Sequence, residues 1–275
     1  MTQNDQHAQA TALRALHQSG IFVLPNAWDA GSAAIIARAG AKVIATTSAG
    51  VSWALGRPDG HGLTRAEMID AVRRIAATVD VPVSADIEGG YGPGPDDVAA
   101  TVEAVIAAGA VGVNLQDSRG GGLLFDSAEQ AERLRAARAA AERAGLPELV
   151  INARTDVFLH EIGAPQGRLA DVQSRSPAYA EAGADCLFVP GLVDLDMISA
   201  LTKGPLPVNV MAEPGTPGVA ALKAAGVRRV SVGSAISQAA YSLARRAAAE
   251  LLADGTYAQM EGADSFGSID GAFSR

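Results

Sequence analysis

Cysteine, histidine and aromatic residues are scarce in this chain of 275 residues. The single cysteine, Cys186, excludes an intramolecular disulfide framework and a cysteine-rich zinc cluster. The four histidines, at positions 7, 17, 61 and 160, are too scattered to suggest a histidine metal site or a catalytic triad. Aromatic residues make up 4% of the chain and hydrophobic residues 48%. This composition favours interlocked strands and helices over a β-sandwich.

The chain also lacks an excess of positive charge and a long apolar run. Its 22 basic and 30 acidic residues give a formal net charge of −8. An acidic field repels phosphate backbones, so nucleic acid is not expected as a partner, and an anionic substrate would need local cations. The first twenty residues lack a signal-peptide core, and no uncharged stretch is long enough to span a membrane. We expect a soluble cytoplasmic protein that does not bind membranes.

Short β-branched segments alternate with alanine-rich amphipathic segments. The eight predicted strands are 21–24, 42–46, 82–87, 112–116, 149–154, 186–189, 207–211 and 229–232. The predicted helices are 30–38, 64–78, 95–108, 127–143, 169–182, 194–201, 216–225 and 234–253. Several strands are apolar throughout, as expected for strands covered on both faces. Eight β–α units of this kind predict a (β/α)8 TIM barrel.

No linker interrupts the chain, so we predict one domain over residues 1–275. Residues 234–275 form a C-terminal extension made of the last helix and a tail rich in glycine and serine. This tail is either disordered or packed on a neighbouring subunit.

The segment SADIEGGYG, residues 84–92, ends the third predicted strand. Asp86 and Glu88 are two residues apart, so they project to the same side of the strand, at the end where barrels of this type carry active sites. Two acids are costly to bury there without a cation between them. Oxygen ligands without histidine favour Mg²⁺, or Mn²⁺, over zinc. In the alternative interpretation, Glu88 caps the loop and Asp86 pairs with Arg154.

Further polar residues end neighbouring strands. Arg154 ends the fifth strand, where it would bind a carboxylate through two hydrogen bonds or pair with Asp86 or Asp117. Asp59 lies in the GRPDG loop after the second strand, where an acid can be a simple turn former. Gln116 and Asp117 end the fourth strand. The glycines that follow them in RGGG predict either a loop that closes over a substrate or a passive surface loop.

Six segments, LPNAWDAGSA, GRPDG, SADIEGGYG, GVNLQDS, INARTD and FVPG, occur in this order between about Leu24 and Gly233. Together they resemble the isocitrate lyase/phosphoenolpyruvate mutase superfamily. The resemblance implies a Mg²⁺ ion chelated by a 2-oxo acid substrate, with Asp86 as the direct protein ligand. It also implies a homo-oligomer, a dimer of helix-swapped dimers. The implied metal ligands are Asp86, Asp59, Glu88 and Gln116, and the implied substrate-binding residues are Ala49, Gly50, Val51, Asp86, Arg154 and Asn209. The resemblance implies that the backbone around Ala49, Gly50 and Val51 is a loop that wraps the carboxylate and oxo group of the substrate.

Two departures from the family pattern affect the expected chemistry. Gln116 stands where the family usually has glutamate. The segment SRGGG, residues 118–122, lacks the lysine and the cysteine proton donor of the isocitrate lyases, and it also lacks the lysine and asparagine of the phosphonate enzymes. Arg154, Ser118 and Arg119 remain as catalytic candidates, with water or Ser118 as the proton donor.

The intact acidic cluster predicts a carbon–carbon bond lyase. Its substrate would be a small 2-oxo or 2-hydroxy di- or tricarboxylic acid resembling oxaloacetate or isocitrate, cleaved through an enolate that the metal and Arg154 stabilise. One alternative is a carbon–phosphorus bond mutase or hydrolase of phosphonopyruvate type. The other is a non-catalytic protein that binds a 2-oxo acid such as 2-oxoglutarate.

Overall fold

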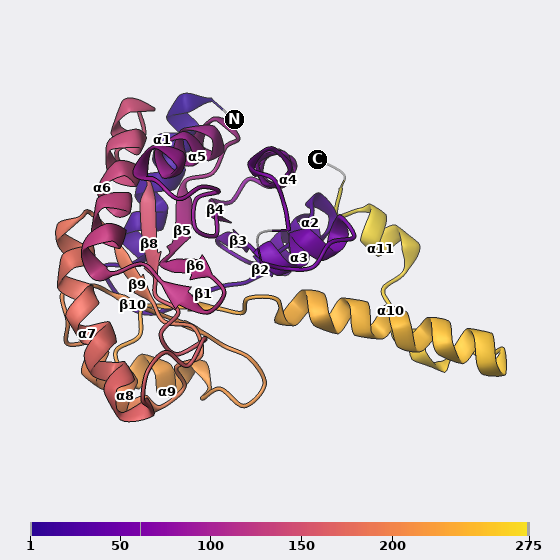
Figure 1. Ribbon diagram of the computed structural model, residues 1–275. Helices are drawn as coiled ribbons and strands as arrows, with labels where there is room; N and C mark the ends of the chain where they lie inside the picture. The colour runs from indigo at the N-terminus through magenta and orange to yellow at the C-terminus, as the bar shows by residue number, and fades with distance from the viewer. Residues whose placement is uncertain (1, 61, 274–275) are drawn as a thin grey trace.

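A closed parallel sheet forms the centre of the molecule (Figure 1). The computed structural model describes residues 2–60 and 62–273. The sheet order is β1 (Phe22–Leu24), β11 (Arg229–Ser231), β10 (Val208–Met211), β9 (Cys186–Phe188), β8 (Val150–Arg154), β5 (Gly112–Gln116), β4 (Val83–Asp86), β3 (Ile44–Thr46) and β2 (Asn26–Ala27). Only Pro25 separates β1 from β2, because proline has no N–H for the ladder. These two segments therefore act as one strand position, and the sheet closes into an eight-position barrel.

Most of the helices surround this barrel, and the last two form the C-terminal extension (Figure 1). They are α1 (Gln3–Leu16), α2 (Ala30–Arg38), α3 (Ser48–Ala54), α4 (Arg65–Thr78), α5 (Pro95–Ala107), α6 (Ser127–Arg143), α7 (Pro165–Glu181), α8 (Leu195–Leu201), α9 (Val219–Ala224), α10 (Ala235–Asp254) and α11 (Phe266–Asp270). All eight predicted strands and all eight predicted helices are present, with boundaries shifted by a few residues. The predicted (β/α)8 TIM barrel with a C-terminal helical extension is confirmed.

Helix α1 is an element that the sequence pattern did not predict. It begins with a capping box between Thr2 and Asp5, and its buried residues Ala10 and Leu13 face the barrel. A Cβ at Gly112, the first residue of β5, would lie 3.0 Å from a methyl group of Leu13. Helix α1 therefore covers the amino ends of the strands.

The segment expected to surround the substrate as a loop is also helical. Ala49, Gly50 and Val51 lie in the first turn of α3, because the Thr47 side chain caps the helix by accepting a hydrogen bond from the Gly50 N–H at 3.5 Å. The expectation of a loop was wrong for the backbone conformation. These three residues are buried at the carboxyl end of β3.

Helix α10 extends away from the barrel, and the chain then returns toward α2 (Figure 1). Arg38 of α2 donates a hydrogen bond to the carbonyl of Gly271 at 2.7 Å. The outer part of α10 exposes Leu243, Leu251 and Leu252, the last with 87% of its surface in solvent. Among the described residues, no helix combines the length and apolar character that crossing a membrane requires.

Candidate active site

Three polar residues stand at the ends of adjacent strands of the barrel. Asp86, Gln116 and Arg154 are the last residues of the adjacent strands β4, β5 and β8. Their position is the carboxyl end of the barrel, where enzymes of this fold carry their active sites. This end is therefore the candidate active site.

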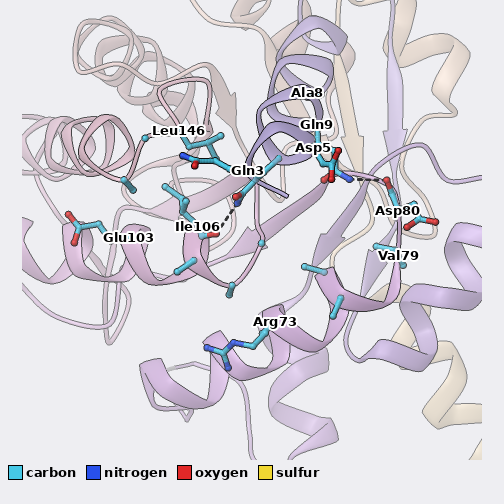
Figure 2. Close-up of a pocket in the computed structure, with 18 residues that line it drawn as sticks. Gln3, Asp5, Ala8, Gln9, Arg73, Val79, Asp80, Glu103, Ile106 and Leu146 are labelled. Atoms are coloured by element: carbon cyan, nitrogen blue, oxygen red, sulfur yellow. Dashed lines mark hydrogen bonds between the residues drawn. The ribbon is translucent and has the colours of Figure 1, made fainter. Parts of the chain in front are cut away.

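A cavity of about 750 Å³ lies at the opposite end, where α1 meets α4, α5 and α6 (Figure 2). Glutamine side chains that line this cavity donate hydrogen bonds to backbone carbonyls. Gln6 donates to the carbonyls of Ile106 and Ala110 at 2.8 and 3.1 Å, and Gln9 donates to that of Asp80 at 2.9 Å. Because these polar groups already have partners, we assign this cavity no function.

Asp86 is a buried acid at the centre of the candidate site. Its backbone N–H donates to the Thr46 hydroxyl at 2.8 Å, and its carboxylate accepts the Glu88 N–H at 3.1 Å. Burial raises the pKa of Asp86, the positive charge of Arg154 opposes this rise, and the negative charge of Asp59 adds to it. Asp86, Arg154 and Asp59 are therefore close enough to form one electrostatic cluster.

The loop after Asp86 has an unusual backbone. Glu88 and Tyr91 have positive φ values of 47° and 58°, in the left-handed region that side chains other than glycine rarely adopt. Glu88 is buried, and the Tyr91 hydroxyl donates to its Oε1 at 3.2 Å. Burial, followed by the charges of Glu88, Asp86 and Asp59, raises the pKa of Tyr91. Tyr91 is thus a neutral donor facing the acidic cluster.

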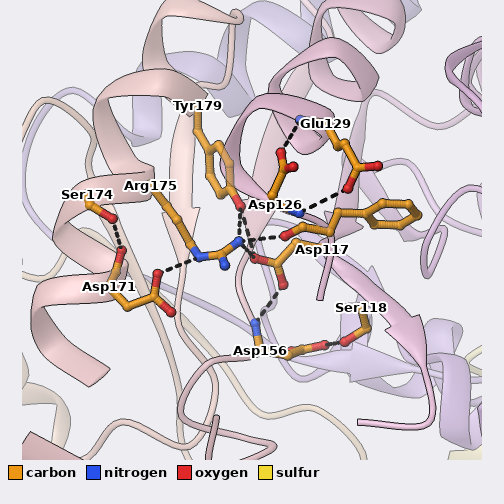
Figure 3. Close-up of polar contacts among 10 residues, drawn as sticks. Asp117, Ser118, Asp126, Glu129, Asp156, Asp171, Ser174, Arg175 and Tyr179 are labelled. Atoms are coloured by element: carbon orange, nitrogen blue, oxygen red, sulfur yellow. Dashed lines mark hydrogen bonds and ion pairs between the residues drawn. The ribbon is translucent and has the colours of Figure 1, made fainter. Parts of the chain in front are cut away.

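Arg154 is fixed by an acid that the sequence analysis did not select. Its Nε donates to Oδ1 of the fully buried Asp156 at 2.6 Å. Burial alone would lower the pKa of Arg154, but the carboxylates of Asp156, Asp86 and Asp59 together raise it. The other oxygen of Asp156 accepts the Ser118 hydroxyl (Figure 3). Asp156 therefore orients both Arg154, the predicted substrate arginine, and Ser118, the candidate proton donor.

Asp117 anchors the start of the glycine-rich segment (Figure 3). Its carboxylate accepts the Tyr179 hydroxyl at 2.9 Å, Nη1 of Arg175 at 3.2 Å and the Asp156 N–H at 3.0 Å. Burial raises the pKa of Asp117, although the Asp156 N–H, the Thr155 side chain and the charge of Arg175 oppose the rise. Asp117 does not pair with Arg154, which was one predicted possibility. It instead joins the strand ends to α7.

The glycine-rich segment forms an antiparallel hairpin of β6 (Ser118–Gly120) and β7 (Leu123–Leu124). Its three glycines, 120–122, all have positive φ values. The Arg119 side chain is 48% exposed, and its guanidinium lies 3.4 Å from Glu129 and 4.8 Å from the centre of the Phe125 ring. In this conformation Arg119 lies outside the acidic cluster, so we assign it no chemical step.

The remaining predicted site residues lie on β5, on β10 and in the loop before α4. Gln116 is partly buried, and its N–H donates to the carbonyl of Glu88 at 3.0 Å. Asn209 of β10 is fully buried. Its Oδ1 accepts from Ser231 at 3.4 Å, while its Nδ2 has no hydrogen-bond partner among the described residues. Asp59 lies in the exposed loop before α4.

Two side chains near the site, His160 and Asp156, were missed because both follow the end of β8. His160 places its Nε2 3.7 Å from Asp156, although the histidines are scattered in sequence. Asp156 is part of the INARTD segment, but it follows the strand end, where alternation no longer predicts direction. His61 lies outside the described residues.

The donor set suits magnesium. The available groups are the carboxylates of Asp86, Glu88 and Asp59 and the amide oxygen of Gln116, so every donor is an oxygen. Within residues 2–60 and 62–273, no three histidine, cysteine or acidic side chains converge as a ready-made metal cage. Mg²⁺ typically binds through one or two carboxylates and keeps several waters. These residues therefore fit a Mg²⁺ ion whose other ligands are water and substrate oxygens.

Comparison with known proteins gives consistent relatives. A family model described as phosphoenolpyruvate phosphomutase matches residues 13–252. An uncharacterized protein of Mycobacterium tuberculosis (strain H37Rv) is 40% identical over 245 residues, which cover 87% of this chain and 88% of that protein. The 2-methylisocitrate lyase of Escherichia coli (strain K12) is 31% identical over 201 residues, 70% of this chain and 65% of the lyase. The structure of an oxaloacetate acetylhydrolase with oxalate bound has a TM-score of 0.84 and 28% identity, covering 97% of this chain and 94% of that one.

Proposed function

Because this chain belongs to the phosphoenolpyruvate phosphomutase family, within the isocitrate lyase/phosphoenolpyruvate mutase superfamily, we propose that it is a Mg²⁺-dependent carbon–carbon bond lyase. Its substrate is a small 2-oxo or 2-hydroxy di- or tricarboxylic acid. The observation that carries this proposal is the placement of the buried Asp86 and the partly buried Arg154 at the ends of β4 and β8, where the charge of each, together with that of Asp59, shifts the pKa of the other. Likeness to a methylisocitrate lyase and to an oxaloacetate acetylhydrolase supports the substrate class.

Magnesium, when bound at Asp86, would act as a Lewis acid on the oxygens of the substrate. Arg154 binds the substrate carboxylate, since Asp156 occupies its Nε and the described residues form no hydrogen bond with its two terminal nitrogens. A guanidinium in this position also stabilises negative charge that develops when the carbon–carbon bond breaks. Asn209 offers a substrate oxygen its Nδ2, which has no hydrogen-bond partner within residues 2–60 and 62–273.

Ser118 is the proton donor that the hairpin offers. Its hydroxyl donates to Asp156 in this conformation, so delivery requires the hydroxyl to rotate toward the substrate carbon. Water then restores the proton on Oγ of Ser118. This arrangement takes the place of the cysteine that the hairpin lacks, and it explains why a lyase can retain the acidic cluster without that thiol.

Turnover assays test the proposal. We expect purified protein with Mg²⁺ to cleave oxaloacetate, 2-methylisocitrate or a related acid, and we expect chelation with EDTA to abolish the reaction. Release of phosphate or rearranged product from phosphonopyruvate alone would favour the carbon–phosphorus alternative. Binding of 2-oxoglutarate without any product would favour the non-catalytic alternative.

The same proposal includes an assembly. Helix α10 exposes Leu243, Leu251 and Leu252, and an apolar stripe of this kind is costly to leave in water. We propose that residues 235–273 pack on a second copy of the chain. The variant Leu251→Glu with Leu252→Glu should reduce the mass measured by light scattering by at least half. Unchanged mass would contradict this assembly.

A further inference from the structure

Arg133 of α6 binds the backbone of the loop that follows β4. Its guanidinium donates to three carbonyls of this loop, those of Gly89, Gly92 at 3.3 Å and Pro93 at 2.6 Å. Arg133 is almost completely buried. A buried guanidinium that serves only backbone carbonyls is costly, because burial disfavours its charge and lowers its pKa. The reason for burying Arg133 must therefore lie in the loop whose carbonyls it binds.

Side chains from two other helices bind the remaining carbonyls of the loop. Thr101 of α5 donates to the carbonyl of Gly90 at 2.8 Å. Arg65 of α4 donates to that of Tyr91 at 3.3 Å. All five carbonyls of residues 89–93 are thus held by side-chain donors on the surrounding helices, and Arg133 supplies three of the five bonds.

The loop needs this support because its backbone is strained. Glu88, Gly90 and Tyr91 all have positive φ values, and only one of the three is glycine. Residues with side chains persist in this region only where their surroundings fix them, and such strain is concentrated at functional sites. Glu88 is the predicted outer metal ligand, and Tyr91 donates to it. The bonds from Arg133 therefore fix the part of the loop that places Glu88.

Arg133 also contacts the hairpin side of the site. The central carbon of its guanidinium lies 4.2 Å from the centre of the Phe125 ring, over which Arg119 of the hairpin lies at 4.8 Å. The Phe125 N–H donates to the carbonyl of Asp117, the residue that precedes the hairpin, at 2.8 Å. The Arg133 side chain thus contacts both the loop that carries Glu88 and the segment that flanks the hairpin.

We propose that Arg133 is a positioning residue that holds Glu88 in its strained conformation for the metal and couples that loop to the β6–β7 hairpin. The inference rests on the proposed magnesium site. Loss of Arg133 releases the loop, so Glu88 withdraws and metal affinity falls. A purely structural arginine would lower stability without changing metal affinity.

The same helix supplies a matched control. Arg138, five residues further along α6, donates to the carbonyls of Pro147 at 2.9 Å, Leu149 at 2.8 Å and Gly183 at 2.9 Å. These carbonyls belong to loops at the amino end of the barrel. Arg133→Met and Arg138→Met each remove hydrogen bonds to three backbone carbonyls from one helix, and Arg138→Met also removes an ion pair with Asp185. Only the bonds of Arg133 lie beside the candidate site.

Calorimetric titration with Mg²⁺ and Mn²⁺ measures the metal affinity of each variant. Removing a group that orients a metal ligand typically weakens affinity by about 10- to 100-fold, and we expect a loss in this range for Arg133→Met. Arg138→Met should melt at a lower temperature with unchanged metal affinity. Should Arg133→Met fail to fold, Arg133→Lys replaces it, because a lysine keeps the charge but cannot bridge three carbonyls.

A double-mutant cycle tests whether Arg133 acts through Glu88. In a Glu88→Gln background, Arg133→Met should cause no further loss of metal affinity, whereas independent roles would make the two losses additive. Equal metal affinity in wild type and Arg133→Met, or additive losses in the cycle, would overturn the inference alone. Failure of the wild-type protein to bind either metal would instead overturn the proposed function, and this inference with it.

Discussion

At the carboxyl ends of the strands, Asp86, Asp117 and Asp156 are buried acids held by hydrogen bonds, including those from Arg175 to Asp117 and from Arg154 to Asp156. At the amino ends, Asp185 is a partly exposed acid. Asp185 lies between two guanidinium groups, those of Arg138 at 2.6 Å and Arg14 at 3.1 Å. Burial raises the pKa of Asp86 and Asp117. Burial of Asp86 and Asp117 at the carboxyl end therefore costs free energy of folding, whereas Asp185 at the amino end stabilises the fold through its two ion pairs.

Helix α6 passes both ends and repeats the same contrast. Arg138 ties ordinary αβ loops together, while Arg133 holds a loop with strained residues at Glu88 and Tyr91. Proteins depart from stable local arrangements chiefly at functional sites. The contrast therefore predicts that substitutions at the carboxyl end change activity more than stability, and that those at the amino end do the reverse.

The largest expected effect comes from Asp86→Asn. Removal of the central carboxylate should lower kcat/KM by about 10³-fold or more, equivalent to about 4 kcal/mol of transition-state stabilisation. The melting temperature should stay constant or rise, because a buried charge is removed. Steady-state kinetics and thermal melting measure both quantities.

Asp185→Asn is the matched control at the amino end. It should destabilise the fold by about 2 kcal/mol, because charged hydrogen bonds to two arginines and to the Ile151 N–H at 2.8 Å are weakened. Its kcat should remain that of wild type. Equal losses of activity in the two variants would break the comparison between the two ends.

Arg154→Lys should have the next largest effect. A lysine keeps the positive charge but loses the planar fork that binds a carboxylate while Asp156 holds the other nitrogen. We expect kcat/KM to fall about 10²-fold, mainly through KM, a loss of about 2.7 kcal/mol. Initial-rate measurements over a range of substrate concentrations separate KM from kcat. A wild-type KM in this variant would remove Arg154 from the substrate site.

Ser118→Ala tests the proton donor. Because water can replace a hydroxyl in part, we expect kcat to fall by roughly 10- to 100-fold, at the lower end of the usual range for acid catalysis. Steady-state kinetics measure kcat, and mass spectrometry of the product that the variant forms in D₂O measures the incorporation of deuterium. Unchanged kcat would show that water alone supplies the proton.

The smallest expected effect concerns pH and stability at the amino end. Burial, followed by the charge of Arg229, lowers the pKa of His17 to about 3, while a histidine in an unfolded chain titrates near 6.5. Below about pH 6.5, His17 therefore binds a proton in the unfolded chain but not in the folded chain. As a result, the free energy of unfolding falls by about 2 kcal/mol between pH 7 and pH 5. His17→Gln should remove this part of the pH dependence in urea titrations. An identical pH slope in the variant would contradict the role of His17.

The sequence predicted the strands because they are buried on both faces and are apolar throughout. Helix α1 was not predicted, because its surface is mostly polar and only Ala10 and Leu13 are fully buried. In the site, Asp86, Glu88 and Arg154 could be placed because each falls at or just beyond a strand end. Arg133 could not, because its guanidinium binds a carbonyl 44 residues away in sequence.

The central claim is that a divalent cation held at Asp86 binds a 2-oxo acid at the barrel mouth. The most direct measurement is calorimetric titration of the protein with oxalate, a stable dicarboxylate, in the presence of Mg²⁺ and again in the presence of EDTA. The account predicts binding with Mg²⁺ that is lost in EDTA and in Asp86→Asn. Equal affinity for oxalate under all three conditions would contradict it.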